Sequence, residues 1–286
     1  MLRISVALIV FITAFQMYCG TQFRPFSANP MEARVGVIQI NEENEPTDEF
    51  QNPGRLRLDI GITYDLFDLY DNEKVDIDFG TDWMVWTRLR SEGRFKFPVE
   101  TSDYWFGINS TIRPKNLESD SWIKDWGGRI RVAHISSHLV DGYTNRQEEE
   151  WSFIKTPLVY SREFVELSGY ISPLENLRLY AGLNYIFSTI PDDFSLLIPQ
   201  LGVDYRLPVS NLLSGLNIEA GYDGKIVGIG GDYSIQNSMQ AGLLYLGEKG
   251  KGLFFGLYYY SGPSIHGMFF MDRDGYIGLG GQVYFY

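Results

Sequence analysis

The last stretch of the chain, residues 275–286, reads Gly-Tyr-Ile-Gly-Leu-Gly-Gly-Gln-Val-Tyr-Phe-Tyr. Tyr276, Leu279, Val283 and Phe285 are apolar, and Gly and Gln lie among them, which predicts a β-strand at the end of the chain. A soluble protein rarely ends on a strand with an apolar outer face. A lipid-facing β-barrel does so routinely, because closure of the barrel leaves no unpaired edge and the apolar face meets lipid. This stretch therefore predicts a transmembrane β-barrel.

The beginning of the chain predicts export. Residues 1–3 (Met-Leu-Arg) form a short basic start, and residues 4–15 form an apolar run. Such a run fits the apolar region of a secretory signal and is too short to span a bilayer. An exported β-barrel is expected in the outer membrane of a Gram-negative type cell. The chain then divides into a signal peptide at residues 1–20, a periplasmic N-terminal segment at residues 21–32 and a barrel at residues 33–286.

The single cysteine, Cys19, leaves two ways of processing the signal open. It follows the apolar run and could carry the lipid of a lipoprotein. The preceding residues 16–18 (Gln-Met-Tyr) lack the small residue that lipoprotein cleavage requires, and a clean A-x-A site is absent as well. We favour ordinary cleavage near residue 20.

The composition agrees with a membrane barrel. Aromatic residues make up 15% of the chain, as expected of two interfacial girdles. The mean hydropathy of −0.14 does not exclude a barrel, because only every second residue faces lipid. The formal net charge of −12 argues against nucleic acid, which needs clustered Lys and Arg. The expected partners are outer-membrane lipid and lipopolysaccharide, and the acidic segments 41–51 and 147–150 are either solvated loops or binders of lipopolysaccharide-bridging cations.

Period-two alternation and turn signals predict about twelve strands, with ten and fourteen as open alternatives. The predicted strands span residues 33–40, 55–69, 75–90, 103–113, 126–140, 160–171, 177–188, 200–208, 216–227, 232–246, 253–264 and 276–286. Short turns such as residues 71–73 alternate with longer loops such as residues 141–159. The predicted fold class is all-β, a transmembrane antiparallel β-barrel with short periplasmic turns and longer extracellular loops.

Alternation also separates the two faces of each strand. In residues 75–85 the odd positions are Val, Ile, Phe, Thr, Trp and Val, whereas Asp76, Asp78 and Asp82 occupy even positions. The apolar set is expected to face lipid, because an ionised side chain near the membrane midplane costs about 2–4 kcal/mol. The interior is then expected to hold a network of Arg55, Arg57, Asp59, Asp76, Asp78, Asp82, Arg129, Arg131, Arg178, Asp204, Arg206 and Glu219. We favour a filled, ion-paired interior over a narrow channel, because side chains can nearly bridge a barrel of this size.

Three motifs carry a resemblance to a known family. Residues 23–34 read Phe-Arg-Pro-Phe-Ser-Ala-Asn-Pro-Met-Glu-Ala-Arg, residues 134–141 read His-Ile-Ser-Ser-His-Leu-Val-Asp, and residues 261–269 read Ser-Gly-Pro-Ser-Ile-His-Gly-Met-Phe. Together they resemble an uncharacterised family of bacterial outer-membrane β-barrel proteins, known only as a domain of unknown function. The resemblance implies a barrel and the outer membrane, and it implies no activity. The first motif is too proline-rich for a strand, and we expect it to pack across the periplasmic mouth as a short plug.

The second motif contains two of the three histidines. On one strand face, His134 and Ser136 are about 6.6 Å apart, whereas His134 and His138 are about 13 Å apart, too far to share a metal ion. We therefore expect no metal site. His-x-Ser supplies a base and a nucleophile, and it resembles outer-membrane phospholipase A and lipid A deacylase barrels, in which an orienting Asn or Glu follows about twelve residues later. Glu148 lies at that distance, so His134, Ser136 and Glu148 are the candidate catalytic residues.

The faces of the strand decide whether this motif can act on lipid. If Arg129 and Arg131 face the interior, unbroken alternation puts His134 and Ser136 on the lipid face, where an acyl-ester hydrolase needs them. Alternatively, the motif is a polar hydrogen-bonded cluster near the extracellular rim, since Glu148 falls in an acidic run that reads as an exposed loop.

Three functions remain open on the sequence alone. A small pore or passive transporter requires an open lumen, a lipid-acting hydrolase requires the His-x-Ser site, and a structural or envelope-interaction barrel requires neither. We favour a barrel without catalysis, in a structural or small-solute passage role and without a cofactor. Calcium is considered only for the hydrolase alternative.

Overall fold

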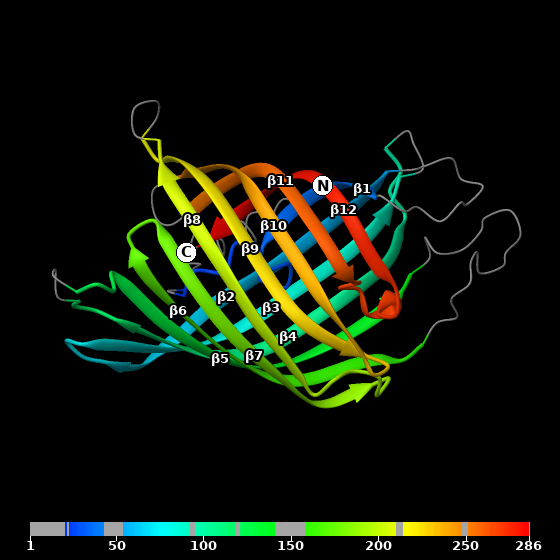
Figure 1. The fold of residues 1–286 in the computed structure, drawn as a ribbon, viewed down its shortest axis with the longest axis horizontal. Coiled ribbons are helices and arrows are strands. Elements are labelled where there is room, and N and C mark those ends of the chain that lie inside the picture. The colour runs from blue at the N-terminus through cyan, green and yellow to red at the C-terminus, as the bar shows by residue number, and fades with distance from the viewer. Residues whose placement is uncertain are drawn as a thin grey trace, which may run out of the picture.

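The computed structural model describes residues 21, 23–42, 54–91, 95–117, 121–140, 158–209, 214–247 and 251–285. In these residues the chain forms a closed barrel in which each strand pairs antiparallel with its neighbours in sequence, and β1 pairs with β12 (Figure 1). The strands are β1 (Val35–Glu42), β2 (Arg55–Asp71), β3 (Val75–Arg90), β4 (Val99–Pro114), β5 (Asp125–Leu139), β6 (Tyr160–Leu174), β7 (Leu177–Ile190), β8 (Leu197–Pro208), β9 (Leu216–Ile229), β10 (Asp232–Leu246), β11 (Lys251–Pro263) and β12 (Arg273–Phe285). A short 3₁₀ turn, η3 (Gly267–Phe269), lies between β11 and β12. No helix of the described residues is long and apolar enough to cross a membrane.

The predicted all-β fold and the twelve antiparallel strands are confirmed. Two strands differ most from their predictions: β4 spans Val99–Pro114 and not residues 103–113, and β1 spans Val35–Glu42 and not residues 33–40. Arg34 holds the preceding chain in the interior, because its guanidinium donates hydrogen bonds to Gln282 Oε1 at 3.1 Å and to the carbonyl oxygen of Asn29. The predicted signal peptide lies outside the described residues.

The two rims of the barrel differ in their connections. We call the rim where β1 begins and β12 ends the terminal rim, and the opposite one the loop rim; they lie at the left and right of Figure 1. Short turns such as residues 72–74 lie at the terminal rim, whereas β5 ends and β6 begins at the loop rim with a longer stretch of sequence between them. Two connections depart from this pattern. At the terminal rim a longer stretch of sequence separates the end of β4 from the start of β5, and at the loop rim only Gly230 and Gly231 join β9 to β10, both at positive φ (61° and 89°).

The strands turn apolar side chains outward and charged side chains inward, as alternation predicts. On β3, Trp83 is 53% exposed whereas the adjacent Asp82 is 0% exposed. Leu201 of β8 and Leu257 of β11 are also largely exposed on the outer surface. The outer surface is therefore apolar around the barrel, and the ionised groups are gathered inside.

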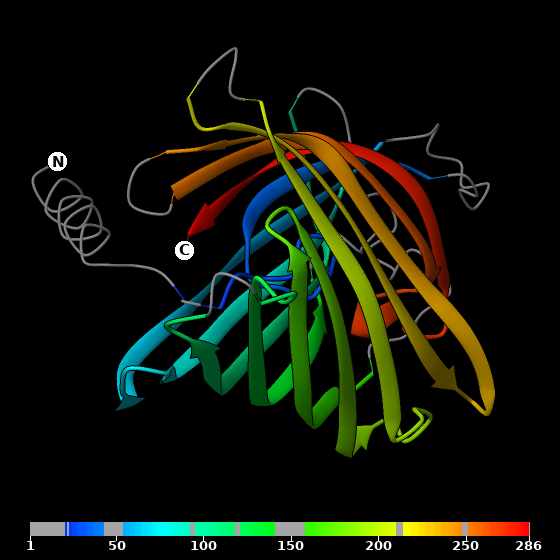
Figure 2. The same ribbon diagram turned by 60° about the vertical axis from the view of Figure 1, so that its left-hand side comes forward.

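Two segments of the chain occupy the interior. We call Thr21 together with residues 23–34 the plug; Figure 2 shows it in blue within the ring of strands. Phe26 of the plug is buried, and its ring stacks on Tyr180 of β7 at a centroid distance of 3.8 Å. From the loop rim, the β11–β12 connection folds inward, where Met268 and Phe269 join a buried apolar cluster with Trp105 of β4. Side chains of both segments thus occupy part of the interior of the barrel.

Candidate functional site

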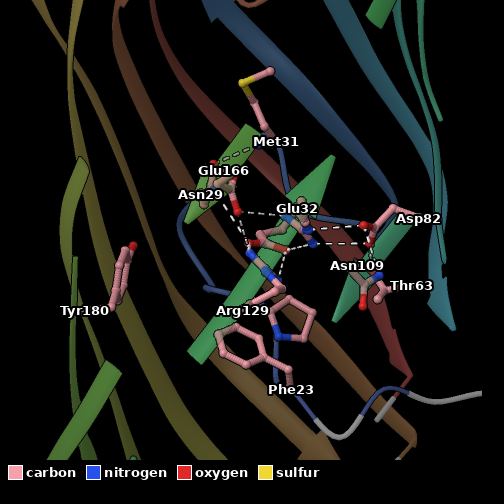
Figure 3. A network of polar contacts seen from close by, with 12 residues as sticks. Phe23, Asn29, Met31, Glu32, Thr63, Asp82, Asn109, Arg129, Glu166 and Tyr180 are labelled. Carbon is pink, nitrogen blue, oxygen red and sulfur yellow. Dashed lines mark hydrogen bonds and ion pairs between the residues drawn. The ribbon is translucent and has the colours of Figure 1, made fainter. Parts of the chain in front are cut away.

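A buried ion-pair network joins the plug to the barrel wall (Figure 3). At its centre, Arg131 of β5 is 0% exposed and meets carboxylates from three elements. Its Nη2 lies 3.0 Å from Glu32 Oε2 of the plug, its Nε 3.2 Å from Asp82 Oδ2 of β3, and its Nη1 3.4 Å from Glu166 Oε1 of β6. One guanidinium therefore connects the plug to two strands besides its own.

Glu32 receives a second guanidinium from the neighbouring inward position of β5. Arg129 Nη1 donates to Glu32 Oε2 at 3.1 Å, and Arg129 Nη2 bonds to Glu32 Oε1. Burial alone would raise the pKa of Glu32, but the charges and hydrogen bonds of Arg129 and Arg131 lower it to about 2. Glu32 is therefore ionised at neutral pH, and its charge holds the plug to β5.

The rest of the plug is held by hydrogen bonds along its length. Arg178 of β7 donates hydrogen bonds of 2.6 Å to the backbone carbonyls of Arg24 and Pro25. Lys225 Nζ of β9 lies 2.7 Å from Asn29 Oδ1. The plug is therefore attached to β5, β7 and β9 of the wall.

The predicted interior charges lie as follows. Arg57, Asp59, Asp76, Asp78, Asp82, Arg129, Arg131, Arg178, Asp204 and Glu219 are buried, and Arg55 and Arg206 are half-buried. Most of them pair directly: Arg57 Nε with Asp59 Oδ1 at 2.7 Å, and Arg206 Nη2 with Glu219 Oε2 at 2.6 Å. Sequence reasoning missed two central members of the network. Glu32 lies in a proline-rich stretch outside any strand, whereas Glu166 alternates with Val165 and Leu167, a signal that could have identified it.

The His-x-Ser motif lies on the outer face of β5. Ile130 and Val132, at alternate positions before it, are 47% and 43% exposed, and the side chain of His134 is 43% exposed. In the register, His134 lies opposite Glu163 of β6, and Ser136 lies opposite Ser161. His134 and Ser136 thus share the outward face that alternation predicts, on the half of β5 nearer the loop rim.

A carboxylate of the adjacent strand holds the imidazole. His134 Nδ1 lies 2.8 Å from Glu163 Oε1, and Ser161 Oγ donates to the same oxygen at 2.6 Å. Glu148, the partner predicted from sequence spacing, lies outside the described residues. Sequence reasoning missed Glu163 because it sought the partner at a fixed distance along the chain. The alternation of Ser161, Glu163 and Val165 on one face was the signal that could have found it.

The arrangement matches part of a nucleophilic site. Because Nδ1 faces Glu163, the other ring nitrogen, Nε2, is available to take a proton. Ser136 is the next outward side chain along β5, about 6.6 Å away along the strand, and the described structure contains no hydrogen bond between it and His134. Glu163 as the orienting acid, His134 as the base and Ser136 as the hydroxyl therefore lie in this order on one outward-facing surface.

The second and third sequence motifs contact each other at the loop rim. His266 is buried, and its Nδ1 lies 2.7 Å from Asp103 Oδ2 of β4. The backbone N–H of Gly267 donates to Asp103 Oδ1 at 2.7 Å, and that of Met268 donates to Ser137 Oγ at 3.2 Å. These contacts hold the β11–β12 connection inside the barrel, so both motifs help to close the interior.

Comparison with known proteins identifies a family and a shared fold. The family described as "Protein of unknown function (DUF1207)" matches residues 106–286, which include the second and third motifs. The outer membrane phospholipase A of Escherichia coli has a TM-score of 0.52 at 12% identity, over 92% of this chain and 93% of that chain. The outer membrane phospholipase dimer of Salmonella typhi with bound calcium has a TM-score of 0.54 at 13% identity, over 92% of this chain and 94% of that chain. Likeness at these identities shows the fold alone. No curated protein sequence matches the chain.

Proposed function

Because the chain belongs to the DUF1207 family of proteins of unknown function and has the fold of bacterial outer-membrane barrels, we propose that it is a sealed barrel with a structural role in the outer membrane. In that membrane the terminal rim faces the periplasm, and the outer surface contacts lipid and lipopolysaccharide. The observation that carries the proposal is the buried contact of Glu32 with Arg129 and Arg131, which ties the plug across the interior. Passage of small solutes, the other role we considered, requires displacement of this plug.

Conductance measurements in planar bilayers test the sealed barrel. The refolded protein is expected to give no steady conductance at neutral pH, because the plug and the β11–β12 connection both occupy the interior. A general porin inserted under the same conditions serves as the positive control. Reproducible ohmic steps from the wild-type protein would contradict the proposal and favour solute passage.

A second candidate function rests on the contact of 2.8 Å between His134 and Glu163 on the outer surface. We infer that this site, with Ser136, hydrolyses acyl esters of outer-leaflet lipid. In this mechanism Ser136 Oγ attacks the ester carbonyl while His134 Nε2 takes the hydroxyl proton. Glu163 accepts a hydrogen bond from Nδ1–H and stabilises the imidazolium. The proton then passes to the departing alcohol, and water hydrolyses the acyl-enzyme.

The substrate class follows from the position of the site. On the half of β5 nearer the loop rim, the site would meet the outer leaflet, where phospholipids and lipid A carry acyl esters. The two structures named as outer membrane phospholipase share the fold, and one of them binds calcium, so calcium is included in the assay.

Release of fatty acid from mixed micelles tests the hydrolase. Ser136→Ala, His134→Ala and Glu163→Gln are each expected to lower the rate by about a thousandfold or more, since each removes a member of one catalytic unit. His138→Ala is the matched control, because His138 lies outward on the same strand and contacts Tyr104 instead of Glu163. Activity that survives Ser136→Ala, or no activity in any variant with or without calcium, would leave the motif as a polar cluster on the surface.

A further inference from the structure

Carboxylates gather inside the barrel at the terminal-rim ends of β2 and β3. Asp68 of β2 lies directly opposite Asp78 of β3, and Asp76 is two residues away on the same face. One oxygen from each of these three carboxylates lies within 4.8 Å of the other two. Like charges directly opposite each other destabilise a sheet, so this arrangement requires a compensating positive charge.

Two irregularities in β2 create the cluster. The register of β2 against β3 shifts between Asp65 and Phe67, and again between Asp68 and Tyr70. Successive residues of a regular strand face alternate sides of the sheet. Without such a shift, Asp65 and Asp68, which are three positions apart, would therefore face opposite sides. With it, both lie opposite inward positions of β3. Bulges of this kind commonly direct a side chain toward a functional site.

Buried oxygen atoms beside these carboxylates point independently to a bound cation. Four of them make no hydrogen bond: Asp76 Oδ1, Asp78 Oδ2, Asn109 Oδ1 and Thr111 Oγ1. On β4, Thr111 lies opposite Asp78, and Asn109 lies opposite Gly80. Asn109 Nδ2 donates to Asp82 at 3.1 Å, and its amide oxygen lies beside Gly80, where a Cβ would be 2.9 Å from it. Buried polar atoms in native proteins nearly always have a partner, and these four oxygen atoms lie beside one acidic cluster that a ligand could bridge.

The cationic side chains nearby pair with Asp76 and not with Asp78. Arg113 Nη2 lies 2.8 Å and Lys115 Nζ 3.9 Å from Asp76 Oδ2. Asp78 is only 2% exposed and forms no ion pair with any cationic side chain in the described part of the chain. A buried carboxylate without a counter-charge is costly, so Asp78 is either protonated or bound to a cation.

We propose that Asp68, Asp76 and Asp78 bind a divalent cation of the calcium type, with Asn109 and Thr111 as further ligands. The donor set consists of carboxylate, amide and hydroxyl oxygens alone, which suits a hard cation and disfavours zinc, whose usual ligands include His or Cys. Asp68 is exposed and gives the ion a route from the periplasmic side. The site stands apart from the His134 surface, so it does not depend on the proposed hydrolase.

Calorimetric titration of the refolded protein with CaCl₂ after EGTA treatment tests the site, together with thermal unfolding in CaCl₂ and in EGTA. The wild-type protein is expected to bind saturably and to unfold at a higher temperature in CaCl₂ than in EGTA. Asp78→Asn is expected to weaken calcium binding by about tenfold or more, because the affinity of such sites follows the charge of their ligands. In EGTA, the Asp78→Asn variant should unfold at a temperature no lower than that of wild type, because the substitution removes one of the like charges. Asp232→Asn, an exposed change at the start of β10, is the matched control and should bind as wild type does.

Two outcomes would overturn the proposal. One is a protein whose unfolding temperature does not respond to CaCl₂ but rises when the pH is lowered, which indicates a proton shared between carboxylates. The other is unchanged calcium binding in both Asp78→Asn and Asp68→Asn. The second variant, at an exposed position, keeps the test decisive if the first fails to refold. Ser136→Ala should leave calcium binding unchanged, which separates this site from the hydrolase.

Discussion

Glu32 illustrates how one residue can hold a segment inside a barrel. It is 1% exposed and shares its two oxygens between Arg129 and Arg131. The free-energy cost of removing these charges from water is offset only while Glu32, Arg129 and Arg131 keep their partners. Because the pKa of Glu32 is lowered to about 2, its contribution to stability is complete above the usual carboxyl pKa and is lost as the pH falls through the folded value.

The substitution Glu32→Gln tests this residue. It leaves two buried guanidinium groups with less negative charge, and we expect it to lower the free energy of unfolding by about 3–5 kcal/mol. Denaturant unfolding of the refolded protein at neutral pH, followed by tryptophan fluorescence, measures the change. Glu73→Gln, at an exposed turn of the terminal rim, is the control and should be close to neutral. Equal stability of the two variants would show that the plug is held by other contacts.

At the scale of the element, β12 closes the barrel through close backbone contact. Gly280 lies opposite Ile38 of β1 on one side and Gly256 of β11 on the other, and Gly256 in turn lies opposite Gly242 of β10. A Cβ at Gly280 would lie 2.8 Å from the Ile38 Cα, and one at Gly256 would lie 2.8 Å from the Gly242 Cα. These positions therefore have no room for a side chain, and the row of glycines lets the strands approach where the barrel closes.

We expect Gly280→Ala to destabilise the barrel by about 1–3 kcal/mol, because the backbone of β1 must move to admit the methyl group. Gly275→Ala on the same strand is the matched control, since a Cβ there would meet nothing within 4 Å. Heat-modifiable migration on gels and denaturant unfolding would measure the difference. A Gly275→Ala variant as unstable as Gly280→Ala would indicate that backbone freedom, and not space, is what β12 requires.

At the scale of the whole molecule, two segments from opposite rims occupy the interior of the barrel. The plug uses ion pairs and hydrogen bonds, with Glu32 and Arg178 as its main attachments. The β11–β12 connection uses apolar packing of Met268 and Phe269, together with the His266–Asp103 contact. Met31 and Ala33 of the plug pack against the apolar cluster that contains Met268 and Phe269, so the two segments support each other inside the barrel.

The sequence predicts the strands and their faces well, because the alternation of apolar and polar residues is visible within each strand by itself. The partners of the charges were harder to predict. Glu163 meets His134 through the register of two strands joined by a long connection, which no spacing along the chain reveals. His266 is buried because its connection folds inward, and Glu32 becomes central because the plug enters the barrel. Both depend on contacts between distant parts of the chain.

The plug also constrains the order in which the molecule assembles. Glu32 is 97 and 99 residues from its two arginine partners, and Asn29 is 196 residues from Lys225. Contacts of such long range form late, since the loss of chain entropy precedes their gain in energy. β1 follows the plug directly and pairs with β12, so the wall closes around the plug only once both of these strands are in place. The first strand of the barrel thus waits for the last, and the open sheet must curl around the plug that precedes β1.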